Sequence, residues 1–102
     1  MPQEPEAEKS PSVRVAAARL DTLWPHVGLP RVDLLKLDVE GAEEAALTGA
    51  AETIGRHRPF ILCSYEHPSN DRDRLTEIVT GIDRSYMPRN IPDRQLLTFE
   101  PL

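Results

Sequence analysis

The sequence predicts an α/β domain organised as half of a doubly wound sheet. Two nearly continuous apolar runs, residues 32–38 and 60–65, end abruptly in polar residues, which is typical of buried parallel strands. A stretch with apolar residues at helical spacing follows each run. Because strand–helix–strand connections are right-handed crossovers, the first two strands are expected to be parallel. The 102 residues are expected to form one such domain.

Composition narrows the classes of function. Hydrophobic residues make up 39% and charged residues 28% of the chain, as in soluble globular proteins. The net charge is −5 and no run of Lys and Arg is interleaved with aromatic residues, so nucleic acid is not an expected partner. No apolar stretch reaches the roughly 18 residues of a membrane span, so no membrane partner is expected. Because the one cysteine has no partner for a disulfide, which is compatible with a reducing cytosol, we expect a cytoplasmic protein. The single Cys63 is expected to be a small buried hydrophobe.

The first 24 residues predict a lead-in, a short strand and a short helix. Residues 1–12 are acidic, proline-containing and almost free of apolar side chains, which predicts a disordered lead-in to a domain over residues 13–102. Valines alternate with arginine at residues 13–15, which indicates a short edge strand. Apolar residues at helical spacing over residues 20–24 predict a short helix that ends before Pro25.

A helix is expected between the strands predicted over residues 32–38 and 60–65. It is predicted to begin near Glu40 or Gly41 and to end at Gly55, with Glu43 and Glu44 solvated in its first turn. Its apolar face is expected to consist of Ala46, Leu47, Ala50 and Ile54.

The remaining residues predict a second helix and a hairpin. Asn70 resembles an N-cap, and the helix after it has the clearest period in the chain. Its apolar positions are Leu75, Ile78, Val79 and Ile82. Residues 86–87 and 95–99 are expected to be two closing strands, joined across a loop over residues 88–94.

Four segments carry a specific resemblance to a known family. They are residues 32–43 (VDLLKLDVEGAE), 47–50 (LTGA), 58–62 (RPFIL) and 20–23 (LDTL). Their polar positions, glycines and proline resemble the FkbM family of S-adenosylmethionine-dependent methyltransferases, in register over nearly the whole of the first three segments.

The resemblance implies the C-terminal half of a class I methyltransferase (Rossmann-like) sheet with its closing β-hairpin. In that fold residues 32–38 would be the fourth of seven strands and residues 60–65 the fifth, with helices on both faces. The family binds S-adenosylmethionine on a glycine-rich turn after the first strand and an acidic residue after the second. The five glycines here include no G-x-G, so the chain alone is expected to bind the cofactor weakly or not at all.

Candidate site residues follow the two strands, where open α/β sheets bind ligands. The resemblance places Asp38 beside the methyl donor and the acceptor, so it is expected to contact the cofactor and to accept a proton; capping of the next helix is the alternative. Glu40 is a second acid, a metal ligand or a charge at the helix N-terminus. His67 is a general base or a turn residue before Pro68, and the role of Glu66 stays open. No Cys and His spacing typical of a metal site occurs.

Two functions are compatible with these observations. The first is methyl transfer to an oxygen of a small-molecule or sugar acceptor by a truncated or partial enzyme. The alternative is a non-catalytic remnant that acts as a binding or assembly module. Because half a sheet leaves strand 32–38 unpaired, the expected macromolecular partner is a second copy of the chain or an upstream N-terminal half.

Overall fold

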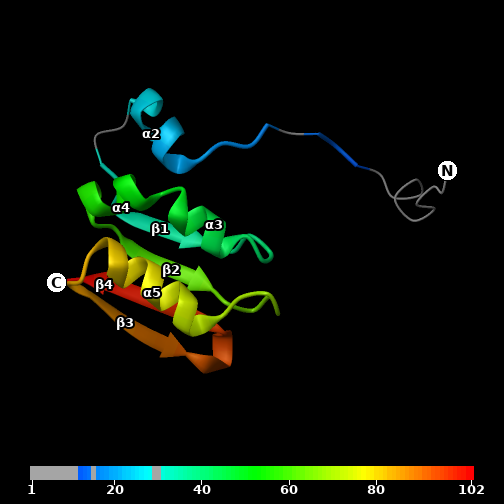
Figure 1. The fold of residues 1–102 in the computed structure, drawn as a ribbon, viewed down its shortest axis with the longest axis vertical. Helices are drawn as coiled ribbons and strands as arrows, with labels where there is room; N and C mark the ends of the chain where they lie inside the picture. Colours follow the sequence, from blue (N-terminus) through cyan, green and yellow to red (C-terminus); the bar gives the residue numbers. More distant parts are fainter. Residues whose placement is uncertain (1–11, 15, 29–30) are drawn as a thin grey trace.

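The computed structural model describes residues 12–14, 16–28 and 31–102, and it confirms the α/β class (Figure 1). In chain order the elements are α2 (Leu20–Val27), β1 (Leu34–Leu37), α3 (Glu43–Thr48), α4 (Ala51–His57), β2 (Phe60–Ser64), α5 (Arg72–Ile82), β3 (Tyr86–Ile91), the 3₁₀ turn η1 (Pro92–Arg94) and β4 (Leu96–Pro101). Of the lead-in predicted over residues 1–12, residues 1–11 lie outside the described residues.

The four strands form one sheet in the order β1-β2-β4-β3. β1 and β2 are parallel, with Leu34 beside Phe60 and Leu37 beside Cys63, as the crossover rule predicts. β4 is antiparallel to both β2 and β3, so the predicted closing hairpin is present. The hairpin folds back so that its second strand, β4, lies between β2 and β3.

The helices α3, α4 and α5 cover one face of this sheet (Figure 1). The successive connections from β1 to β2 and from β2 to β3 are both right-handed and advance in the same direction, so their helices fall on the same side. The opposite face carries Leu34 and Met87, which are 57% and 55% exposed. The arrangement with helices on both faces, implied for the complete fold, is therefore not present in the described part of this chain.

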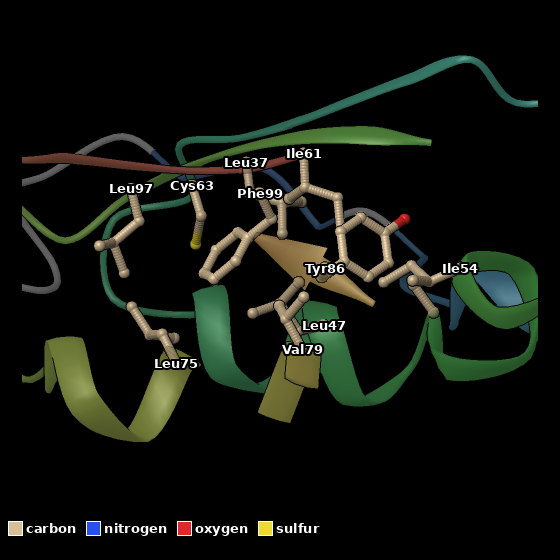
Figure 2. Close-up of a cluster of buried hydrophobic side chains, with 11 residues drawn as sticks. Leu37, Leu47, Ile54, Ile61, Cys63, Leu75, Val79, Tyr86, Leu97 and Phe99 are labelled. Atoms are coloured by element: carbon tan, nitrogen blue, oxygen red, sulfur yellow. The ribbon is translucent and has the colours of Figure 1, made fainter. Parts of the chain in front are cut away.

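The core lies between the sheet and the helix layer (Figure 2). Its sheet side chains come from alternate positions of each strand, because successive residues of a strand face opposite sides. The helix α5 contributes Leu75 and Val79, so its predicted apolar period is confirmed. The largest side chains with almost no exposed surface include Phe99, Leu47, Ile54, Ile61, Leu75 and Val79.

The single helix predicted over residues 40–55 is wrong, because the chain forms α3 and α4 with a break at Gly49 and Ala50. The cause is Asp21 of α2, whose carboxylate accepts hydrogen bonds from the backbone N–H groups of Glu52 (2.9 Å) and Thr53 (2.8 Å). These N–H groups belong to the first turn of α4, so Asp21 caps that helix from another part of the chain. Gly55 lies inside α4 rather than at its end.

Several element ends differ from the predictions. The helix α2 continues through Pro25 and ends at Gly28, whose φ of 81° is left-handed. The N-cap of α5 is Asp71, which accepts from the Asp73 N–H at 2.9 Å, and not Asn70. The strand β3 includes Pro88, which was expected in a loop.

The expected edge strand at residues 13–15 is not formed in the part that the structure describes. Val13 lies outside any strand and is 86% exposed, while Val15 lies outside the described residues. The strand predicted over residues 32–38 is shortened to Leu34–Leu37, the residues that pair with β2.

Candidate functional site

The loops after β1 and β2 meet at the carboxyl edge of the sheet. Gly41 of the first loop has a φ of 103° and lies against His67 and Ser69 of the second. A Cβ atom at Gly41 would be 2.8 Å from Nδ1 of His67, which is closer than real Cβ contacts allow. Both the backbone conformation and the space therefore require glycine here. The structure thus brings together the two loops that carry the predicted site residues.

Asp38 and Glu40 are both exposed in the first of these loops. Glu40 has a φ of 53°, in the left-handed region that non-glycine residues rarely adopt. Within the described part of the chain, neither side chain makes a hydrogen bond or an ion pair. The N-cap position of α3 is Ala42, so Asp38 does not cap this helix. The edge therefore presents two carboxylates in contact with solvent.

Glu43, which was expected to be a solvated residue of the first turn, is instead 1% exposed. Its carboxylate accepts hydrogen bonds from the N–H groups of Val39 (2.7 Å) and Gly41 (3.0 Å) and from Nδ2 of Asn70 (2.8 Å). Burial alone raises the pKa of this carboxyl, but the hydrogen bonds from Asn70, Val39 and Gly41 outweigh it, so the pKa lies below its usual value. Glu43 is therefore a buried anion that joins the two loops.

Sequence reasoning missed this role because acidic residues in a first helical turn are usually exposed. The signal that was present is a third carboxylate three residues after Glu40, together with an amide side chain, Asn70, in the loop after the next strand. Neighbouring Glu44 does behave as expected, since it is exposed and pairs with Arg74 at 3.3 Å.

The ring of His67 is half-buried and held by Ser69. The backbone N–H of Ser69 donates to Nδ1 of His67 at 3.1 Å, and Ser69 Oγ lies 2.8 Å from the same atom. Because Nδ1 accepts a hydrogen bond, the neutral ring carries its proton on Nε2. In this arrangement His67 offers an N–H donor rather than a free base, while Glu66 is exposed.

Comparison with known proteins gives two findings for this chain. Residues 3–91 match the model of the methyltransferase FkbM domain. The chain belongs to the FkbM methyltransferase family. It is also similar to the crystal structure of methyltransferase FkbM from Methylobacillus flagellatus, at 32% identity and a TM-score of 0.60 over 74% of this chain. No match was found among curated proteins.

The chain spans 21% of the length of that FkbM structure. The fold implies S-adenosylmethionine, yet this chain has no G-x-G turn to hold it. The one glycine of the carboxyl edge, Gly41, has its open side against His67 and Ser69. The residues of this chain therefore do not by themselves fit the cofactor.

On the β1 flank, this FkbM family chain has an open apolar groove of about 680 Å³. It lies between the start of α2, β1 and α3 and has an almost entirely apolar lining. Its larger side chains are Leu20, Leu23, Leu35, Leu37 and Val39. A groove of this kind beside a strand without an outer neighbour is typical of a surface that another element covers.

The carboxyl edge is backed by a thiol and flanked by an aromatic side chain. Cys63 of β2 is fully buried, as predicted, and burial with the nearby Glu43 carboxylate raises the pKa of the thiol to about 12. Tyr65 donates from its hydroxyl to Oδ1 of Asn90 at 2.7 Å, and the guanidinium of Arg72 lies 5.7 Å from the ring centre. The Arg72 guanidinium and the Tyr65 ring therefore make a cation–π contact.

Among the residues that the structure describes, no three His, Cys, Asp or Glu side chains are grouped closely enough to hold a metal ion. In the same residues, no helix is both long and apolar enough to span a bilayer.

Proposed function

We propose that this chain forms the acceptor side of an S-adenosylmethionine-dependent O-methyltransferase acting on a hydroxyl group of a small molecule or sugar. The proposal rests on family membership and on one feature of the structure, the pair of exposed carboxylates Asp38 and Glu40 on a loop that Glu43 holds against the next strand end. The remaining part of the sheet, with the cofactor cradle, would come from additional polypeptide.

The roles of the site residues follow from the chemistry of the acceptor. S-adenosylmethionine held by a completed fold would supply an electrophilic methyl group, and the acceptor hydroxyl would have to lose its proton as its oxygen took that group. Asp38, at the end of β1, is proposed as the proton acceptor, with Glu40 as the second candidate. His67, with its proton on Nε2, is proposed to donate a hydrogen bond to the acceptor rather than to remove the proton.

The test is methyl transfer by a completed enzyme. The chain is fused to the N-terminal portion of the Methylobacillus flagellatus relative, and transfer of a labelled methyl group to a panel of sugars and hydroxylated small molecules is measured. Asp38→Asn keeps the shape but removes the charge, so turnover is expected to fall about a hundredfold.

The matched control is Asp33→Asn, before the amino end of β1, where the carboxylate pairs with Arg31 at 2.7 Å and is 71% exposed. It removes the same charge at the opposite end of the strand and is expected to leave turnover unchanged. Equal turnover of Asp38→Asn and the parent would remove Asp38 from the proposed mechanism.

The isolated chain is proposed to bind S-adenosylmethionine weakly or not at all, because neither a glycine-rich turn nor a second-strand acid is present in it. Isothermal titration calorimetry of the chain measures this directly. Micromolar affinity would show that this chain binds S-adenosylmethionine without an N-terminal half of the sheet. The cytoplasmic location expected from the sequence stays a prediction.

A second candidate function is a binding or assembly module without catalysis, which the apolar groove beside β1 favours. The proposed occupant is an N-terminal half-sheet of the same fold, with a second copy of the chain as the other candidate. Titration of the chain with the separately expressed N-terminal portion of the Methylobacillus flagellatus relative distinguishes the two functions. Binding accompanied by methyl transfer supports the enzyme, whereas binding without transfer to any acceptor supports the module.

A further inference from the structure

Glu43 is unusual because it is a buried carboxylate that is stabilised by neutral hydrogen-bond donors and not by a cation. Among the described residues, no Lys, Arg or His nitrogen makes an ion pair with its carboxylate oxygens within 4.0 Å. Its three hydrogen-bond donors are instead two backbone N–H groups and the amide of Asn70. A buried charge is costly unless such donors surround it, so this geometry is maintained only while all three remain in place.

The three donors come from two separate loops. Val39 and Gly41 belong to the loop that carries Asp38 and Glu40, whereas Asn70 belongs to the loop that carries His67. The loops also touch directly, because the open side of Gly41 faces the His67 ring. Asn70 is held in turn, since its backbone N–H donates to the carbonyl of His67 at 3.0 Å. The position of one loop is thus fixed against the other at two points.

We propose that Glu43 and Asn70 are positioning residues that hold Asp38 and Glu40 in a fixed place relative to His67. This inference rests on the proposed function of the carboxyl edge. In this role Glu43 does not touch the acceptor: its carboxylate keeps the first loop folded back, with Glu40 in the left-handed conformation. The Asn70 amide transmits that position to the second loop.

A charge swap within the pair tests this role. Asn70→Asp places two carboxylates against each other, and Glu43→Gln alone leaves at least one loop N–H facing an amide NH₂ group. Combined, the two changes again permit a hydrogen bond between the loops, from the amide of Gln at position 43 to the carboxylate of Asp at position 70. Glu43→Gln is therefore expected to harm the parent chain and to improve the Asn70→Asp variant.

Two readouts are compared for the four chains. In the unfused chain, amide hydrogen exchange at Val39 and Gly41 is expected to become about tenfold faster in Asn70→Asp and to slow again in the double variant. In the completed enzyme, kcat is expected to follow the same order with a change of about tenfold. The control is Glu44→Gln, which removes the neighbouring exposed carboxylate and is expected to change neither readout.

The outcomes separate this inference from the proposed function. Equal kcat in Asn70→Asp and the double variant would overturn the positioning role, as would exchange rates at Val39 and Gly41 that do not respond to either change. Absence of methyl transfer in the completed parent enzyme would overturn the proposed function instead. In that case the exchange pattern still decides whether Glu43 and Asn70 fix the loops.

Discussion

Both β1 and β3 are edge strands of the sheet in the described chain, but their surroundings differ. On the β3–β4 flank, which we call the closed flank, the edge strand is paired through a hairpin, whereas on the β1 flank, the open flank, the edge strand borders the apolar groove. On the helix-covered face, the β4 residue Phe99 is fully buried, while Leu35 in the same row of β1 is only half-buried and lines the apolar groove. The comparison teaches that contacts within this chain cover the apolar side chains of one flank, whereas the other flank keeps exposed apolar surface, which is the basis of the proposed docking of an N-terminal half.

The largest expected effect comes from truncating a core side chain on the closed flank. Phe99→Ala is expected to lower the free energy of unfolding by about 3–5 kcal/mol, because it leaves a cavity among packed residues. Leu34→Ala on the open flank is expected to change it by less than about 0.5 kcal/mol. Urea unfolding followed by circular dichroism measures both, and similar losses would contradict the contrast between the flanks.

The next effect concerns the attachment of α2 on the open flank. Asp21→Ala removes the acceptor of the Glu52 and Thr53 N–H groups and is expected to lower the free energy of unfolding by about 2 kcal/mol. The single tryptophan, Trp24, lies 6.1 Å from the ring of His57 and reports on this contact. Its fluorescence is expected to shift to the red at lower urea than the circular dichroism changes; coincident transitions in the variant would show that α2 is held by other contacts.

Association sharpens the comparison with a matched pair of exposed residues. Leu34 and Met87 have nearly equal exposure, 57% and 55%, but lie on the open and the closed flank. Leu34→Lys is expected to weaken binding of an N-terminal half, or self-association, about tenfold, since it places a charge where apolar surface is covered. Met87→Lys is expected to have little effect. Analytical ultracentrifugation measures both, and equal effects would remove the β1 flank as the docking surface.

We expect the smallest effect from acid. Burial raises the pKa of the Glu43 carboxyl, but its three hydrogen bonds lower the pKa by more than burial raises it. The pKa therefore lies below the ordinary value of 4.5. The ionised form thus stabilises the folded chain above pH 4.5, and this contribution is lost as pH falls through the lowered pKa. The free energy of unfolding, measured from pH 7 to pH 3, is expected to fall less steeply in Glu43→Gln. Identical slopes would show that Glu43 is not linked to folding.

The parts of the fold that could be predicted depend on local periodicity. The strand β2 and the helix α5 were predicted almost completely, because an apolar run and a period of 3.6 are visible in adjacent residues. The break between α3 and α4 could not be predicted from its own segment, since its cause, Asp21, is 31 residues away from Glu52.

The candidate site shows the same limit. The sequence predicted that the ends of β1 and β2 carry polar residues toward one edge, and the structure brings the loops of Asp38 and His67 together there. It did not predict the burial of Glu43, because that depends on Asn70, 27 residues along the chain. The roles of Asp38, Glu40 and His67 in catalysis stay predictions that the fused enzyme tests.

The proline in β3 makes the two edges of the sheet chemically different. Within a sheet, proline is tolerated on an edge strand where its missing N–H faces away from the neighbouring strand. Pro88 lies opposite Phe99 on the edge strand β3, which follows this rule. A strand from another molecule would find no donor at that position of the outer edge, while β1 contains no proline and keeps its full set. The two edges of the sheet therefore differ in their backbone: the β1 strand contains no proline, whereas the β3 strand lacks one N–H donor at Pro88.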